Sequence, residues 1–107
     1  MKPLIVLTTV GATHDAHDLA TDLVEKRLAA CVNIVPRIHS VYRWQGKVER
    51  DDEQLLIIKT VDERLAALKD AIFARHPYDV PELVIVNIDD IGEAYRDWLL
   101  ASLEQRP

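Results

Sequence analysis

The sequence predicts a single α+β domain over residues 1–107, built on a four-stranded antiparallel sheet with two crossover helices on one face. Four segments have the dense apolar or alternating pattern of strands, and three others have the spacing of amphipathic helices. Their order along the chain is strand, helix, strand, strand, helix, strand and final helix. This βαββαβ order plus a C-terminal helix is the ferredoxin-like, split βαβ arrangement. A length of 107 residues suits one core.

The first half of the chain contains the first three predicted elements. Residues 3–10 form a nearly continuous apolar run, which is typical of a buried central strand. A helix follows from Ala16, because apolar residues recur there at helical spacing, and Thr13 is its candidate N-cap. Residues 30–44 read as one long strand that bends at Pro36. Alternation on its second part places four side chains on one face: Ile38, Ser40, Tyr42 and Trp44.

The second half begins with a predicted turn at Gly46 and a polar connection, after which residues 53–59 form the next strand of a long hairpin. Thr60 and Glu63 have the spacing of a capping box, so a helix is expected to start there and to end by His76, before a proline. Residues 82–88 form the fourth strand. Asp90 and Glu93 repeat the cap spacing before a final amphipathic helix marked by Ile91, Tyr95, Trp98, Leu99 and Ser102.

One face of the predicted sheet has no cover in the chain itself. The strands at 53–59 and 82–88 are apolar on both faces, whereas two helices cover only one. Each large apolar side chain left in water costs about 1.5–3 kcal/mol of burial free energy. We therefore expect the second face to be buried in a homo-oligomer, with the last helix covering part of it.

Composition excludes several functional classes. Thirteen basic and eighteen acidic side chains give a net charge of −5 without a basic cluster, which disfavours a nucleic-acid partner. The apolar start is too short to span a membrane. The single cysteine, Cys31, fits a reducing compartment, and a cytoplasmic location is expected. We expect neither catalytic residues nor an organic cofactor, because phosphate-loop, nucleophile-elbow and zinc-protease motifs are absent and no base adjoins Cys31.

Residues 76–82, with the sequence HPYDVPE, hold two prolines, an imidazole, a phenol and two carboxylates. Each proline restricts its own backbone and that of the residue before it, so the polar side chains stand on a stiff connection. Two interpretations stay open. The segment either joins a helix rigidly to a strand or holds a ligand.

The chain resembles the CutA divalent-cation tolerance family through segments that span nearly its whole length. The matching stretches are residues 28–36, 40–47, 56–60 and 76–82, together with Tyr95 and Trp98. The resemblance implies a trimer built by sheet extension through the long hairpin. It also implies a cytoplasmic, non-enzymatic role linked to copper and other divalent metal ions.

The resemblance makes His76 the predicted metal ligand, because imidazole binds copper and zinc well. Some relatives pair a cysteine in the first strand with a His-His step before the proline, and here Thr8 and Arg75 occupy those places. His14 and His17 are a second pair that one helical turn could bring together, or they belong to a solvated first turn.

The alternative function is that of a trimeric, PII-like signalling protein that binds a small ligand in a cleft between subunits. Aromatic walls with orienting charges are typical of such sites. The predicted cleft residues are Cys31, Tyr42, Trp44, Lys59, Tyr78 and Glu82.

Overall fold

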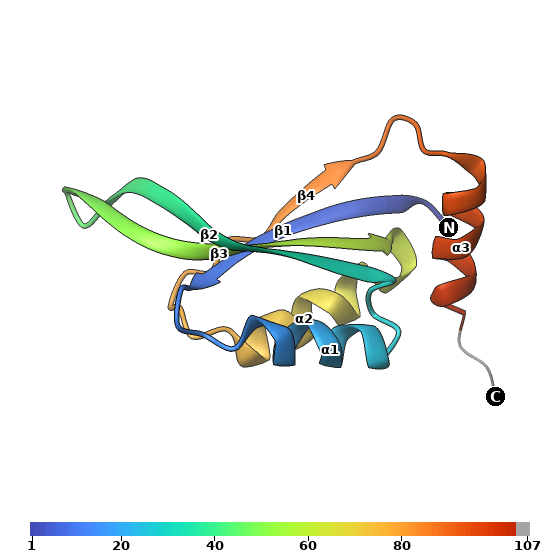
Figure 1. The fold of residues 1–107 in the computed structure, drawn as a ribbon, viewed down its shortest axis with the longest axis horizontal. Helices are drawn as coiled ribbons and strands as arrows, with labels where there is room; N and C mark the ends of the chain where they lie inside the picture. Colours follow the sequence, from blue (N-terminus) through green and yellow to red (C-terminus); the bar gives the residue numbers. More distant parts are fainter. Residues whose placement is uncertain (105–107) are drawn as a thin grey trace.

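The computed structural model describes residues 1–104 and has the predicted order of elements (Figure 1). A short 3₁₀ turn, η1, is the one addition among them. The elements are β1 (Pro3–Gly11), α1 (Ala16–Glu25), β2 (Cys31–Trp44), β3 (Lys47–Val61), η1 (Asp62–Arg64), α2 (Leu65–Arg75), β4 (Val84–Asn87) and α3 (Glu93–Ser102).

The four strands form one antiparallel sheet in the order β2-β3-β1-β4. Helices α1 and α2 lie side by side on one face, and α3 stands at the end of the sheet where β1 begins (Figure 1). This confirms the predicted α+β class and the placement of both crossover helices. The sheet leaves two edge strands, β2 and β4, whose outer backbone groups have no strand beside them in residues 1–104.

The main core lies between the sheet and the α1–α2 layer. Alternate residues of β1 and β3 point into it, and α1 and α2 supply their buried faces. Leu65, expected in the core face of α2, is only partly buried. The fully buried large side chains of this core are Val6, Val10, Leu19, Leu23, Leu56, Ile58, Leu68 and Ile72.

A second, smaller core fixes α3 to the other side of the sheet. Val61 at the end of β3 packs with Leu99 of α3 and with Leu103, the residue that follows this helix. Two arginines hold the C-terminal end of this helix: Arg27 donates to the carbonyl of Ser102 at 2.9 Å, and Arg64 donates to the carbonyl of Leu103 at 2.6 Å. Helix α3 therefore covers one end of the second sheet face and leaves the rest.

The remaining part of that face is apolar and open in the single chain. Ile5, Leu7 and Ile57 point to it and are partly buried, and their partners on β4 are exposed, Val84 at 46% and Val86 at 39%. We call Ile5, Leu7, Ile57, Val84 and Val86 the open face. The predicted shortage of cover is confirmed. The homo-oligomer that would bury this face stays a prediction.

The β2–β3 hairpin extends beyond the sheet as a two-stranded arm (Figure 1). Its register shifts between Val35 and Ile38, around the bend expected at Pro36, and its tip turns at Gln45 and Gly46 with positive φ angles. The expected polar connection before residue 53 was wrong, because β3 begins at Lys47. Solvent lies on both faces of the arm, so backbone pairing with β2 forms the strand without an apolar pattern.

Three local expectations need correction. The N-cap of α1 is Asp15 rather than Thr13, and its carboxylate accepts from the amide of Asp18 at 3.0 Å. Helix α3 follows Gly92 without a side-chain cap, so the Asp90–Glu93 box does not form. The fourth strand is shorter than residues 82–88 because pairing with β1 is confined to Val84–Asn87.

Thr60 is a buried strand residue rather than a helix cap. Its hydroxyl donates to the carbonyl of Leu28 at 2.7 Å, and η1 separates it from α2. The capping box was the wrong interpretation because this contact, 32 residues away in sequence, uses the hydroxyl. Thr8, also fully buried, has a hydroxyl with no hydrogen-bond partner in the described chain.

These two threonines predict opposite effects of the same substitution. Thr60→Val should lower the free energy of unfolding by about 1–2 kcal/mol, because it leaves the Leu28 carbonyl without its donor. Thr8→Val should raise it by about 1 kcal/mol, because it removes an unpaired hydroxyl from the core. Urea unfolding of both variants beside the unchanged protein measures this. Changes of the same sign would contradict the assignment.

Candidate binding groove

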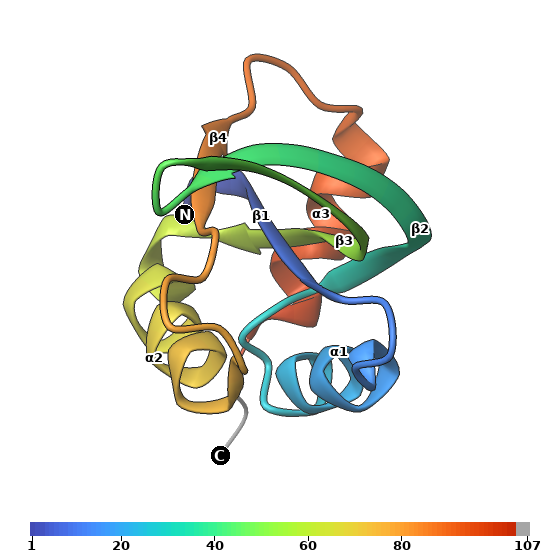
Figure 2. The same ribbon diagram turned by 90° about the vertical axis from the view of Figure 1, so that its left-hand side faces the viewer.

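A groove of about 790 Å³ lies between the arm and the segment that joins α2 to β4. Figure 2 faces the end of the arm and shows that segment rising from the helix layer to the edge of the sheet. We call the set of lining residues the groove: Thr9, Ser40, Val41, Tyr42, Trp44, Asp51, Glu53, Pro77, Tyr78, Asp79, Val80 and Glu82.

Strand alternation builds the arm's side of the groove. On β2, Tyr42 and Trp44 share a face, as expected from their spacing. The register pairs Ser40 with Asp51 and Ile38 with Glu53, so these two carboxylates share that face with the aromatic rings. Two carboxylates and two aromatic side chains therefore point into the groove from the arm.

Two phenols donate hydrogen bonds to these carboxylates. Tyr78 donates to Glu53 at 2.8 Å, and Tyr42 donates to Asp51. The hydrogen bond to Asp51, followed by partial burial, raises the pKa of Tyr42 to about 12. Burial, followed by the hydrogen bond to Glu53, raises the pKa of Tyr78 well above its usual range. A phenol with the ordinary pKa of about 10 is already neutral at pH 7, and these upward shifts keep both hydroxyls protonated donors to still higher pH, with the two carboxylates as acceptors.

His76 anchors the groove segment to β1. Helix α2 ends at Arg75, and His76 continues in an extended conformation, as expected before a proline. Its Nε2 donates to the carbonyl of Thr9 at 2.7 Å, and its Nδ1 accepts from the amide of Tyr78 at 3.1 Å. A carbonyl only accepts and an amide only donates, so these partners assign the proton to Nε2. The ring also meets Tyr78 edge-on, with centroids 4.8 Å apart.

A metal ion at His76 would compete with hydrogen bonds that the ring makes to the backbone. Both ring nitrogens are engaged with the backbone, so a metal ion would have to replace one of these bonds. Within residues 1–104, no three His, Cys, Asp or Glu side chains are grouped as metal ligands, and this includes the pair His14 and His17. Residues 1–104 of a single copy therefore do not supply a metal centre of three or more such ligands.

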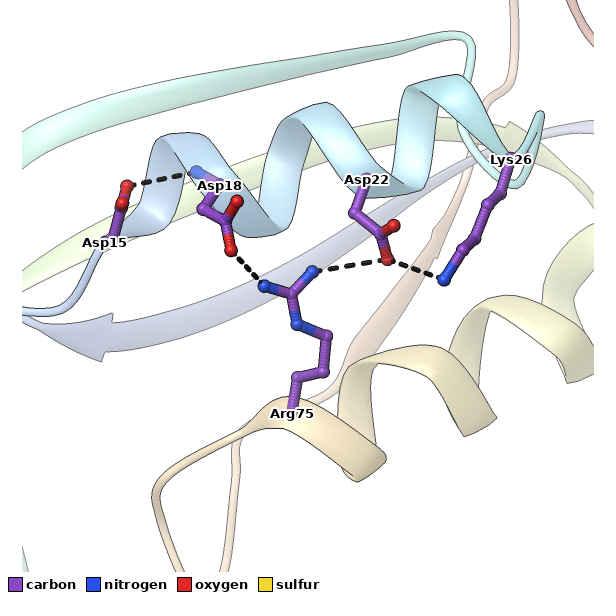
Figure 3. A network of polar contacts seen from close by, with 5 residues as sticks. All are labelled: Asp15, Asp18, Asp22, Lys26 and Arg75. Atoms are coloured by element: carbon purple, nitrogen blue, oxygen red, sulfur yellow. Dashed lines mark hydrogen bonds and ion pairs between the residues drawn. The ribbon is translucent and has the colours of Figure 1, made fainter.

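Arg75 and Thr8, which occupy the places of expected ligands, have structural surroundings. Arg75 forms ion pairs with Asp18 and, at 3.2 Å, with Asp22 of α1 (Figure 3). Lys26 also pairs with Asp22 at 3.0 Å, and its hydrogen bond is the largest cause that lowers the pKa of this carboxyl group. Arg75 thus links the end of α2 to α1, while Thr8 lies buried in the core.

The structure divides the predicted cleft into two places. Tyr42, Trp44, Tyr78 and Glu82 line the groove. Cys31 and Lys59 instead lie opposite each other on β2 and β3, at the end of the two strands away from the arm tip.

Lys59 and its neighbours form a separate cluster beside α3. The Lys59 ammonium donates to the Asn33 side chain at 2.6 Å and lies 5.9 Å from the centre of the Tyr95 ring. The Cys31 sulfur is 3.9 Å from the same Asn33 oxygen. In one copy, neither Cys31 nor Lys59 belongs to the groove lining.

Asp51 and Glu53 are groove residues that sequence reasoning missed. Residues 47–52 have the polar pattern of a connection, which assigns Asp51 to no face, and Glu53 marks only the start of a strand in that pattern. The sequence signal for these two residues is the alternation of Glu49, Asp51 and Glu53. In a hairpin closed at Gly46, these residues lie opposite Tyr42, Ser40 and Ile38 and share their face.

The fold and the groove define a small ferredoxin-like α+β protein with an acidic, aromatic-lined surface groove. The model of the family described as CutA1 divalent ion tolerance protein matches residues 4–102, and the chain belongs to that family.

Relatives agree with this membership. The divalent-cation tolerance protein CutA of Thermus thermophilus is 50% identical over 89% of this chain and 92% of its own length. The chloroplastic protein CutA of Arabidopsis thaliana is 46% identical over 90% of this chain, which spans only 53% of that relative. The crystal structure of CutA1 from Oryza sativa superposes with a TM-score of 0.92 at 42% identity, covering 99% of this chain and 97% of the other.

None of the helices in residues 1–104 is long and apolar enough to cross a membrane.

Proposed function

We propose that this protein acts in divalent-cation tolerance as a non-catalytic, cytoplasmic homotrimer whose metal contacts form between copies. Membership of the CutA1 family and the printed names of its relatives support the tolerance role. Copper is the first cation to test, and other divalent ions follow. The open face supports the assembly, because its partly exposed apolar side chains would be removed from water by packing against a second copy.

The surroundings of His76 carry the proposal that the site lies between copies. One imidazole alone does not hold copper or zinc tightly, and the described chain supplies no group of three ligands. The further ligands therefore have to come from a neighbouring copy. Nδ1 is the proposed ligand atom, because it is the unprotonated ring nitrogen. Its lone pair now accepts a hydrogen bond from the Tyr78 amide at 3.1 Å and would have to turn to the metal ion instead.

The predicted cleft also requires a second copy. Cys31 and Lys59 lie at the end of the sheet beside α3, and the groove lies along the arm. If the arm of one copy reaches the open face of a neighbour, the groove of the first copy would meet Cys31 and Lys59 of the second. The groove itself favours cations over the anionic ligand of a PII-like protein, because four carboxylates and no Lys, Arg or His line it within residues 1–104.

Metal titration of the purified protein, with the native mass confirmed in the same buffer, tests the role of His76. We expect Cu²⁺ or Zn²⁺ to bind, and His76→Gln to weaken binding by about tenfold or more. Glutamine can donate to Thr9 and accept from Tyr78 as the imidazole does, so this variant keeps the segment anchored. His39→Gln, at an exposed histidine on the arm, is the control and should change affinity less than twofold. Equal affinity of both variants would contradict ligation by His76.

A growth assay tests the tolerance role itself. In a bacterial host that lacks its own family member, the unchanged chain should restore growth at inhibitory copper or zinc concentrations. His76→Gln should restore less growth at equal protein level. Absence of any rescue by the unchanged chain would contradict the proposed function.

A further inference from the structure

We propose that the groove of each copy receives Lys59 of a neighbouring copy, whose ammonium group pairs with the Glu53 carboxylate and closes the homotrimer head to tail. This inference rests on the proposed homotrimer and deepens it, because it names the charges that join one copy to the next. Three observations carry it. Glu53 lacks a cation in its own copy, Lys59 lacks a carboxylate in its own copy, and the two cannot meet within one copy.

Glu53 is a buried carboxylate without a basic partner in its own copy. Its exposed fraction is 8%, and no Lys, Arg or His of residues 1–104 forms an ion pair with it. It accepts a hydrogen bond from the neutral phenol of Tyr78 at 2.8 Å, and the groove lining adds three carboxylates but no basic side chain within the described residues. A phenol compensates a buried negative charge only in part, so Glu53 favours a neighbour that brings a cation.

Lys59 has the opposite deficit. It lies two residues beyond Ile57 on β3, so its side chain stands on the sheet face that the proposed assembly buries. Its ammonium group donates to the Asn33 side chain at 2.6 Å and lies 5.9 Å from the centre of the Tyr95 ring. No Asp or Glu of residues 1–104 forms an ion pair with it. Burial of this cation against a second copy is costly unless that copy supplies a carboxylate.

The two charges stand on one face of the same strand, too far apart to pair within one copy. Lys59 follows Glu53 by six positions on β3, which at roughly 3.3 Å per residue separates their backbones by about 20 Å. Two extended side chains do not span that distance. A contact between Lys59 of one copy and the groove of the next joins two different surfaces, and such head-to-tail contacts can close into a ring. A ring of three uses every Lys59 and every Glu53 once.

Exposed aromatic rings flank both charges. Tyr42 and Trp44 line the groove and are 40% and 43% exposed. Tyr95, beside Lys59, packs against Trp98 on α3, and these two are 41% and 48% exposed. The centres of contacts between proteins are enriched in Tyr and Trp. Both ring pairs would therefore leave water together with the ion pair, in continuity with the open face.

Dissociation of the native protein on dilution, followed by light scattering in buffer with EDTA, tests the pair. Lys59→Met keeps a long unbranched side chain without its charge, and Glu53→Gln still accepts from Tyr78. Each single change leaves one buried charge unpaired, so the protein concentration at half dissociation should rise about a hundredfold or more. The double variant has neither charge, so it should dissociate at a lower concentration than either single variant.

Lys69→Met and Asp70→Asn are the matched controls, because both residues lie on α2 in the helix layer. Each should change the concentration at half dissociation less than about threefold. Tighter assembly of Lys59→Met would show that no carboxylate meets this ammonium group, and it would overturn the inference. Additive losses in the double variant, or weakening by Glu53→Gln alone, would overturn it as well.

The same measurements separate this inference from the proposed function. A monomeric unchanged protein would contradict the homotrimer and the ion pair together. A trimer whose single and double variants dissociate like the two controls would contradict the ion pair alone. Because EDTA removes metal ions, the expected pattern of the charge variants would stand even if a separate titration found no copper or zinc binding, and that result would contradict only the metal role.

Discussion

Val86→Asp is expected to convert the proposed homotrimer into monomers. Val86 is 39% exposed on the β4 side of the open face and pairs with Ile5 of β1. An aspartate there would place an unpaired carboxylate in the apolar contact between copies, which costs several kcal/mol for each copy. Size-exclusion chromatography with light scattering measures the change in mass.

The matched control places the same charge on the helix layer. Phe73 is 49% exposed on α2, on the opposite side of the sheet from the open face. Phe73→Asp should keep the mass of the unchanged protein. If Phe73→Asp dissociates the oligomer while Val86→Asp does not, the contact lies on the helix layer and the open face is not the interface.

Ile72→Ala is expected to lower the free energy of unfolding by about 2–5 kcal/mol. Ile72 is fully buried where α2 meets the sheet, so alanine would remove apolar contacts and leave a cavity in the main core. Urea unfolding followed by circular dichroism measures the change. Phe73→Ala, the next residue on the exposed side of α2, should cost less than about 1 kcal/mol. Equal losses from the two variants would contradict the assigned core.

The order of elements could be predicted because each helix or strand buries its apolar side chains, and this gives those residues a regular spacing or a continuous run in the sequence. Residues 3–10 and the helical spacing from Ala16 reflect one buried face each, and these patterns are local in the sequence. Local rules failed where a distant contact decided the outcome. Thr60 has the sequence of a helix cap, but the Leu28 carbonyl takes its hydroxyl, and backbone pairing turns a polar stretch at Lys47 into strand.

The candidate site could be predicted only in part, for the same physical reason. Tyr42, Trp44, Tyr78 and Glu82 were found because aromatic and acidic residues on stiff segments stand out in the sequence. Glu53 is the buried carboxylate of the groove, yet its significance depends on the pairing register and on a phenol 25 residues away. The engagement of His76 with Thr9, 67 residues earlier, has no sequence signal at all.

The most direct test of the central claim is native mass spectrometry of the unchanged protein with and without one equivalent of Zn²⁺ or Cu²⁺. We predict a species of three times the chain mass of 12.2 kDa, with metal adducts on that trimer and none on the monomer released by Val86→Asp. A monomeric native protein, or a monomer that retains the metal, would contradict a site formed between copies.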